Sequence, residues 1–239
     1  MRAPKTPAGT EGSEPPEAWR GRFSHLVGGT LVRALYAGEM HGAQHVPEHG
    51  PVILAANHTG FLDGAVVLGL APRPSHFLVL KQTFEGPVLG PLLRFSGQIA
   101  IDQQRGDRTA LNRALQVLGR GGVIGIFPEG GRGRGDLSAA AKGVGWLAMQ
   151  SGATVIPTAC LGTRRTGDLA ASWPRLRSRL VVDFGASVPL EVPDGLPGRV
   201  RLERVSEQIR VTLADHVAQA SVRHGLPLPT DVPPDILQL

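Results

Sequence analysis

The chain alternates short, wholly apolar runs with longer stretches of helical period. Apolar runs of this length, bounded by glycine, proline or polar residues, are typical of strands buried on both faces. Such runs predict strands over residues 52–56, 76–81, 98–102, 123–127, 154–159 and 179–184. Helical patterns predict helices over residues 65–70, 84–95, 108–118, 138–150 and about 198–224. This alternation predicts an α/β fold with a mostly parallel central sheet flanked by helices.

The two ends of the chain differ from this pattern. Residues 1–17 are rich in Pro, Gly, Glu and Thr and predict a disordered tail, and residues 226–239 predict a Pro-rich C-terminal tail. Residues 38–225 are predicted to form the single folded domain, because 239 residues suit one sizeable core. Within it, Gly38–Gly50 is predicted to be a connector, and Asp107 to cap the helix that follows it.

Residues 18–37 predict an amphipathic helix that precedes this domain. Apolar residues recur at helical spacing from Trp19 to Tyr36, and arginines lie among them. A basic amphipathic helix with aromatic residues at both ends is typical of a membrane interface. The same period also fits a helix whose apolar face packs on the core and whose arginines are solvated. Periodicity alone leaves both interpretations open.

The charge balance favours an anionic partner. The net charge is +5, the pI is near 10.3, and most basic residues are arginine. The single cysteine, Cys160, excludes an internal disulfide and fits a reducing compartment. The polar start lacks the apolar core of a signal peptide, and no apolar run reaches the length of a membrane span. We therefore expect neither secretion nor a spanning helix.

Two groups of residues have the types and spacing that chemistry requires. His58 and Asp63 follow the strand predicted over 52–56, at the carboxyl end where open α/β folds place their sites. A histidine there can accept a proton, and a nearby carboxylate can orient the ring and stabilise its cation. Asp63 is also a possible helix N-cap. The second group is Phe127–Arg132, where a proline bend, two glycines and an arginine suit an anion. The basic pair Arg164-Arg165 is predicted to widen the positive field of this group.

Two other kinds of site are not predicted. His41, His45 and His49 are spaced by four, but Gly42 and Pro47 interrupt a regular helix and no further ligands complete a set, so we expect no metal site. The loop after Phe127 lacks the lysine and Ser/Thr of a nucleotide-binding P-loop. Its arginines are too few, and the aromatic residues too rare, for nucleic-acid binding, so no nucleic-acid partner is expected.

These residues resemble the motifs of a known family. Asn57-His58 with Asp63, spaced as Asn-His-x4-Asp, and Phe127–Arg132, read as Phe-Pro-Glu-Gly-x-Arg, look like the first and third motifs of the glycerolipid acyltransferases of the 1-acylglycerol-3-phosphate acyltransferase type. Val155–Pro157 is similar to the fourth motif, and the stretch from Lys81 to Gly90 resembles one that precedes the second. The resemblance covers about residues 42–184, and the two main motifs together are quite specific.

The resemblance implies an O-acyltransferase that moves a fatty acyl group from acyl-CoA or acyl carrier protein to a lysophospholipid, with 1-acyl-sn-glycerol-3-phosphate the first candidate acceptor. His58 would be the general base, oriented by Asp63, and backbone amides near Gly60 or the helix start after Asp63 would be candidate oxyanion donors. The acceptor would bind to Lys81, Arg105, Glu129, Gly130 and Arg132. No cofactor is implied beyond the thioester co-substrate. The expected location is peripheral, on anionic lipids at the cytoplasmic face of the cell membrane.

The chain departs from the family pattern at two positions. The second motif normally continues Ile-x-x-Asp with arginine, but Gln103 follows Asp102 here and the nearest arginine is Arg105. Gly131 stands where the third motif usually has threonine. Both departures concern the expected phosphate site, so they leave a different alcohol acceptor open.

Two functions of other classes also remain open. One is a non-catalytic protein of the same fold that binds anionic lipid, which would turn over no thioester. The other is a thioester or phosphoester hydrolase, although the chain has no Gly-x-Ser-x-Gly elbow. Such a hydrolase would release free fatty acid without any acceptor.

Overall fold

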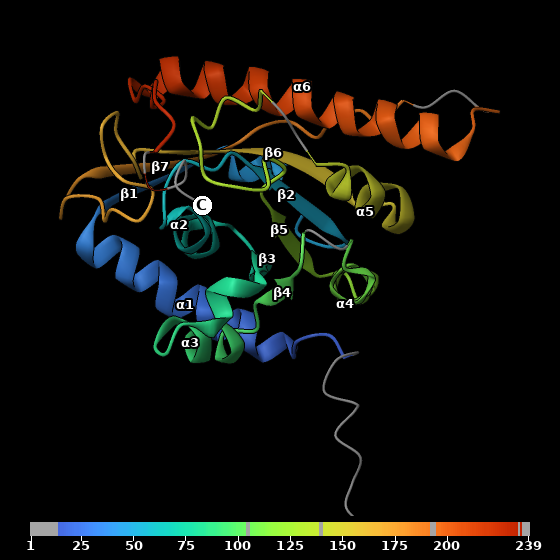
Figure 1. Ribbon diagram of the computed structural model, residues 1–239, viewed down its shortest axis with the longest axis horizontal. Helices are drawn as coiled ribbons and strands as arrows, with labels where there is room; N and C mark the ends of the chain where they lie inside the picture. The colour runs from blue at the N-terminus through green and yellow to red at the C-terminus, as the bar shows by residue number, and fades with distance from the viewer. Residues whose placement is uncertain (1–13, 104–105, 139–140, 192–194, 234, 236–239) are drawn as a thin grey trace, which may run out of the picture.

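A seven-stranded sheet forms the centre of the protein, as a computed structural model shows (Figure 1). The structure describes residues 14–103, 106–138, 141–191, 195–233 and 235. The strands are β1 (Ala37–His41), β2 (Val52–Ala56), β3 (Ser75–Leu80), β4 (Ile99–Ile101), β5 (Val123–Ile126), β6 (Thr154–Leu161) and β7 (Arg179–Phe184). Their order is β1-β7-β6-β2-β5-β3-β4, and every neighbouring pair is parallel except β6 and β7. The predicted mostly parallel α/β fold is confirmed.

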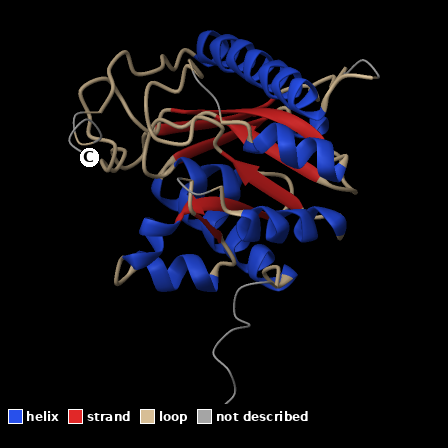
Figure 2. Cartoon of the chain, turned by 45° about the vertical axis from the view of Figure 1, so that its right-hand side comes forward, coloured by secondary structure: helices blue, strands red, loops and turns tan. Residues whose placement is uncertain are grey.

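Helices cover both faces of the sheet (Figure 2). The α-helices are α1 (Ala18–Leu35), α2 (Asp63–Leu70), α3 (Leu89–Phe95), α4 (Arg108–Gly119), α5 (Gly143–Ser151) and α6 (Gly198–His224), and the short 3-10 helices are η1 (Ala43–His45) and η2 (Lys81–Glu85). Buried residues of α4, α5 and α6 form one core cluster with the sheet, and those of α1 and α2 form the other. The central strands are therefore enclosed on two sides.

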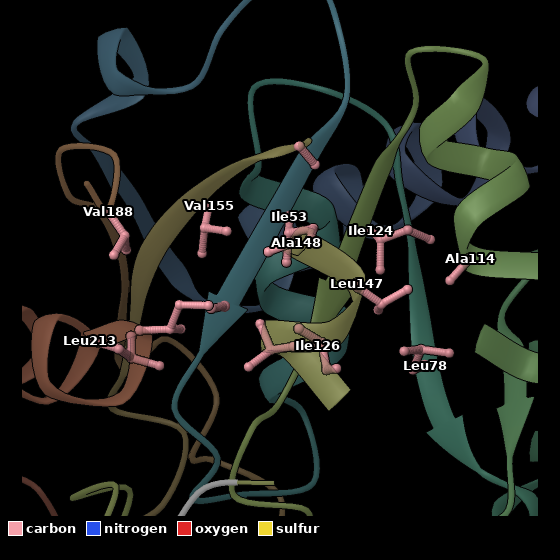
Figure 3. Packing of buried hydrophobic residues seen from close by; sticks show 14 of the residues in the cluster. Ile53, Leu78, Ala114, Ile124, Ile126, Leu147, Ala148, Val155, Val188 and Leu213 are labelled. Atoms are coloured by element: carbon pink, nitrogen blue, oxygen red, sulfur yellow. The ribbon is translucent and has the colours of Figure 1, made fainter. Parts of the chain in front are cut away.

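Strand β2 shows why its sequence is an unbroken apolar run. Ile53 and Ala55 point into the cluster under α4, α5 and α6, where Figure 3 shows Ile53 near Ala148 of α5. Val52, Leu54 and Ala56 belong to the opposite cluster, beneath α1 and α2. All five residues of β2 are fully buried. A strand enclosed on both faces has no solvent side on which polar residues would alternate.

Of three local predictions, the structure confirms one and corrects two. Asp107 is the N-cap of α4, and its carboxylate accepts a hydrogen bond from the Ala110 amide, as predicted. The connector predicted over Gly38–Gly50 is wrong in part, because β1 covers its first residues. That strand is largely exposed at the sheet edge, so it lacks an apolar run. The helix predicted from Ser138 is wrong in its start, since α5 begins at Gly143 after a loop in which Leu137 has a φ of 55°.

Helix α1 presents its large apolar residues to solvent. Its buried face consists of Gly21, Ser24, Gly29 and Val32. Trp19, Phe23, Leu26, Val27, Leu31 and Leu35 are exposed, and Leu26 retains 68% of its accessible surface. The interpretation of α1 as a helix with a core-facing apolar side is therefore wrong. Among the residues that the structure describes, no helix is both long and apolar enough to cross a membrane.

Small residues on its buried face allow α1 to pack closely on α2. A Cβ atom added to Gly69 of α2 would lie 2.6 Å from the carbonyl carbon of Gly28 and 2.7 Å from the amide nitrogen of Gly29. The opposing atoms are backbone, so they cannot rotate away as a side chain would. The two helices can therefore keep this spacing only with glycine at the crossing.

Replacing Gly69 by alanine should loosen this crossing. We expect Gly69→Ala to lower the free energy of unfolding by about 1–3 kcal/mol, because overpacking exceeds the gain in helix propensity. Urea unfolding measures the change. Gly119→Ala is the matched helical control, since a Cβ there would meet no atom within 4 Å, and it should be neutral or slightly stabilising. Equal stability of the two variants would contradict the close-packing account.

Candidate active site

The site lies where the carboxyl ends of three neighbouring strands open into loops. β2 leads to His58, β5 to Phe127–Asp136 and β6 to Thr163. These strands are adjacent and parallel in the order β6-β2-β5. Parallel neighbours end at the same edge of a sheet, so residues more than a hundred positions apart meet there.

His58 and Asp63 form the centre of the site. The Nδ1 atom of His58 lies 2.8 Å from Oδ2 of Asp63. The Asp63 side chain is fully buried, whereas 18% of the His58 side chain is exposed. A buried carboxylate held by hydrogen-bond donors accepts and does not donate, so Nδ1 carries the proton. The lone pair of Nε2 is then left for a substrate.

Further hydrogen-bond donors hold the Asp63 carboxylate. The amides of Thr59 and Gly60 donate to Oδ2 over 2.6 and 2.8 Å, and the Thr163 hydroxyl donates to Oδ1. These bonds offset the cost of burying a charge. The alternative role of Asp63 as a helix N-cap is wrong, because Leu62 is the N-cap of α2. The Gly60 amide, a candidate oxyanion donor from sequence, donates to Asp63 instead.

Asn57 fixes the point at which β2 ends and the turn that leads to Asp63 begins. Its side-chain amide donates to the Cys160 carbonyl over 3.1 Å and accepts from the Cys160 amide over 2.7 Å. The side chain thus replaces a backbone partner and holds β2 to β6 for one more position. Burial, together with the nearby Asp63 charge, raises the pKa of the Cys160 thiol well above its usual value. Cys160 therefore stays a neutral, structural thiol.

The loop after β5 holds His58 from the other side. The imidazole stacks on the Phe127 ring, with centroids 4.1 Å apart and planes 15° apart. Glu129 Oε1 accepts from the His58 amide over 2.9 Å, and the Gly133 amide donates to the His58 carbonyl over 3.0 Å. The Phe127–Arg132 motif therefore positions His58 directly. Sequence alone had assigned Glu129 to the acceptor.

The other predicted binding residues do not all lie in the same part of the structure. Gly130 belongs to the same loop, and a Cβ on it would come within 3.3 Å of Gln103 Oε1. Arg132 donates through Nη1 to the Ala170 carbonyl, 3.2 Å away in the loop after β6. Lys81 is exposed at the start of η2 and lines a separate hollow of about 460 Å³ with Asp102, Asp107 and Arg113. Arg105 lies outside the described residues.

Sequence reasoning missed Thr163 and misjudged Arg164. Thr163 had no motif around it, and only its place just after β6, the strand beside β2, could have indicated its contact with Asp63. The prediction that Arg164 widens the positive field of the loop after β5 is wrong. Its side chain is instead fully buried, and it donates to the Asp168 carbonyl and to the carbonyl and carboxylate of Asp231. It therefore ties the C-terminal segment to the rim of the site.

Comparison with known proteins now decides the family. The model of the acyltransferase family matches residues 38–161, which is more than half of the chain. The chain belongs to the acyltransferase family. The enzyme class expected from the sequence, an O-acyltransferase, is thereby confirmed.

Individual relatives agree with this acyltransferase assignment. The chain is 22% identical over 174 residues to the 1-acyl-sn-glycerol-3-phosphate acyltransferase of Bacillus subtilis, covering 72% of this chain and 83% of that one. It is 28% identical over 125 residues to the enzyme of that name from Borreliella burgdorferi, covering 51% and 50%. It is 25% identical over 155 residues to the chloroplastic LPAT1 of Arabidopsis thaliana, covering 62% and 43%. The chain thus spans half or less of the last two relatives.

A solved structure confirms the fold of this acyltransferase. The crystal structure of the 1-acyl-sn-glycerophosphate acyltransferase PlsC from Thermotoga maritima aligns with a TM-score of 0.64 at 18% identity. The alignment covers 84% of this chain and 79% of that one. At this identity the likeness establishes the arrangement of strands and helices, and the chemistry has to be argued from the site.

Glu129 makes the stability of this acyltransferase depend on pH. Burial raises the pKa of Glu129 to about 7, and the charges of Asp136 and Asp63 add to the effect. Hydrogen bonds from the His58 and Gly135 amides oppose it. Between pH 4.5, the ordinary pKa of a glutamate, and about pH 7, Glu129 is therefore protonated in the folded protein and ionised in the unfolded chain. Stability from this group is full below pH 4.5 and is lost as the pH rises through 7.

Removing the carboxyl group of Glu129 should weaken the dependence of the unfolding free energy on pH. We expect the wild type to lose up to about 3 kcal/mol of unfolding free energy, relative to Glu129→Gln, as the pH rises across this window. Urea unfolding at intervals through the window measures the difference. Glu207→Gln, at an exposed glutamate paired with Arg210, is the control and should follow the wild type there. Parallel curves for wild type and Glu129→Gln would refute the raised pKa.

Proposed function

We propose that this acyltransferase moves a fatty acyl group from an acyl thioester to the hydroxyl of a lysophospholipid in phospholipid biosynthesis, with 1-acyl-sn-glycerol-3-phosphate as the first candidate acceptor. The observation that carries the proposal is the buried Asp63 carboxylate, which accepts a hydrogen bond from Nδ1–H of His58 and so leaves Nε2 as the base. The names of the relatives from Bacillus subtilis and Borreliella burgdorferi support the acceptor.

The chemistry needs no covalent enzyme intermediate. Nε2 of His58 removes the proton of the acceptor hydroxyl, and the oxygen attacks the thioester carbonyl. Asp63 stabilises the imidazolium that forms. The tetrahedral intermediate then expels the thiolate, which takes the proton from Nε2, so ester and free thiol leave and the histidine is neutral again. No resident cofactor is required, because the thioester is already activated. Acyl-CoA and acyl carrier protein both satisfy this scheme as donors.

The oxyanion would be stabilised by the start of α2. Since the Thr59 and Gly60 amides donate to Asp63, the first turn of the helix is the candidate that remains near the base. Gly64 lies in that turn, and a Cβ on it would be 3.7 Å from the Phe127 ring that stacks on His58. The absence of a side chain there leaves space beside the imidazole.

The acceptor headgroup would lie at the loop of Gly130 and Arg132. Arg132 supplies a positive charge, and the carbonyl of Ala170 holds its guanidinium in place. Gln103 lies beside Gly130 and brings an uncharged amide to this loop. That observation favours, as a second candidate, an acceptor with a less charged headgroup. A competition assay with a mixed pool of lysolipids, read by mass spectrometry of the products, separates the two.

Attachment to the membrane would use the exposed face of α1. Phe95 of α3 extends this face, because its ring lies 5.8 Å from Trp19 and 5.3 Å from Phe23 between centroids. Val88 and Leu92 of the same region are also exposed. Residues 18–36 carry three arginines and no acidic residue, which suits an anionic surface. We therefore propose that the enzyme lies peripherally on anionic lipids, and we expect these lipids to be those of the cytoplasmic face of the cell membrane.

Removing the base should nearly abolish transfer. We expect His58→Ala to lower the acyl-transfer rate by about 10²–10⁴-fold, the usual contribution of a general base. The assay follows thiol release from a long-chain acyl-CoA with lysophosphatidate, using purified protein. His49→Ala, at an exposed histidine in the loop before β2, is the control and should retain full activity. Near wild-type activity of His58→Ala would refute the base assignment, and an inactive wild type would favour a lipid-binding protein.

Removing one exposed apolar side chain should weaken vesicle binding. We expect Leu26→Ser to lower the affinity for vesicles of equal parts phosphatidylcholine and phosphatidylglycerol by about tenfold, because a leucine side chain is withdrawn from the bilayer. Sedimentation with the vesicles measures it. Val222→Ser is the matched control, since Val222 is 85% exposed but lies on α6, which covers the other face of the sheet. Equal loss in both variants would contradict a role specific to α1.

A further inference from the structure

The loop between β6 and β7 exposes a second set of large apolar side chains. Leu169, Trp173 and Leu176 retain 48%, 65% and 70% of their accessible surface. The loop, residues 162–178, is nevertheless firmly attached. Asp231 accepts from the Gly167 amide and Asp235 from the Ala170 amide. Its apolar side chains therefore point outward from a tethered backbone.

The loop borders the catalytic site at three places. At its start the Thr163 hydroxyl donates to Asp63. In its middle the Ala170 carbonyl accepts from Arg132. Further on, the Trp173 ring lies 5.7 Å between centroids from Phe61, which belongs to the turn between His58 and Asp63. The exposed residues thus lie at the rim of the site.

The same loop also reaches α1. The Arg177 amide donates to the Leu35 carbonyl over 2.7 Å, and the Ala37 amide donates to the Ser178 carbonyl over 3.0 Å. In Figure 1 the loop lies beside the end of α1 that leads to β1. Leu176 is next in sequence to Arg177, so the loop continues the exposed apolar face of α1 from Leu35 towards the site.

The charges of the loop match those of α1. Arg165, Arg175 and Arg177 are exposed, whereas Asp168 is the single acidic residue between 162 and 178. The Asp168 carboxylate is bound to the Arg165 amide. Exposed apolar side chains among arginines fit the interface of an anionic bilayer, where apolar groups enter the acyl region and arginines meet lipid phosphates.

We propose that this loop is a second membrane contact, which inserts Leu169, Trp173 and Leu176 into the bilayer that binds α1 and so opens the site directly to lipid. An acceptor with an apolar tail then reaches His58 along Trp173 and Phe61 without leaving the bilayer. The route of the acceptor rests on the proposed function, whereas the contact with the bilayer does not.

Trp173 allows the contact to be measured directly. The variant Trp19→Phe/Trp146→Phe keeps Trp173 as its single tryptophan, and Trp19→Phe/Trp173→Phe keeps Trp146, a partly buried residue of α5 on the other face of the sheet. Vesicles of equal parts phosphatidylcholine and phosphatidylglycerol with brominated acyl chains quench tryptophans that enter the bilayer. We expect strong quenching of Trp173 and none of Trp146. A vesicle-bound protein whose Trp173 is not quenched, or a protein that does not bind vesicles, would overturn the proposal.

Activity tests the route of the acceptor. We expect Leu176→Ser to weaken vesicle binding by about tenfold and to raise KM for an acceptor presented in vesicles, with little change for a soluble short-chain acceptor. An equal effect on both acceptors would overturn the route. An inactive wild type with quenched Trp173 would refute the proposed function and leave the contact standing. A concentration-dependent dimer in analytical ultracentrifugation that Trp173→Ala abolishes, without quenching, would assign the surface to a second copy of the chain.

Discussion

The buried carboxylate of Asp63 is the constraint on which the site depends. An ionised carboxylate without access to water is stable only when hydrogen-bond donors surround it. Here the donors come from His58, from the Thr59 and Gly60 amides and from Thr163, so the turn after β2 and the end of β6 are held to one group at the start of α2. Meeting this requirement also fixes the tautomer of His58. The stability of the buried charge and the tautomer of His58 thus have the same physical cause.

The arrangement of the sheet supplies what this carboxylate needs. Parallel strands β5, β2 and β6 end at one edge, so their loops bring Glu129, His58 and Thr163 together. On the face covered by α2, glycines let α1 pack by its small residues and leave its aromatic residues outside. The fold therefore encloses the His58–Asp63 pair and displays apolar surface from the same layer. We infer that a lipid substrate makes both features necessary.

Much of this could be predicted from the sequence, for identifiable reasons. Strands such as 52–56 are enclosed on both faces, and that leaves an unmistakable apolar run. The separation of His58 and Asp63 spans a single turn, so local sequence was enough to pair them. Strand β1 was not found, because an exposed edge strand needs no apolar pattern. The orientation of α1 depends on which face meets Gly69, and a helical period is the same whichever face is buried. The roles of Glu129, Thr163 and Arg164 arise from contacts between distant loops.

Asp63 holds neutral His58 with its proton on Nδ1 and its lone pair on Nε2, and this tautomer can be observed directly. Nitrogen-15 NMR of histidine-labelled protein distinguishes the two neutral tautomers by the shifts and proton couplings of the ring nitrogens, with His58→Ala to assign the signals. We predict that neutral His58 is the Nδ1–H tautomer in the wild type, and that Asp63→Asn shifts the population toward Nε2–H. An Nε2–H tautomer in the wild type would show that Asp63 does not hold His58 in this form.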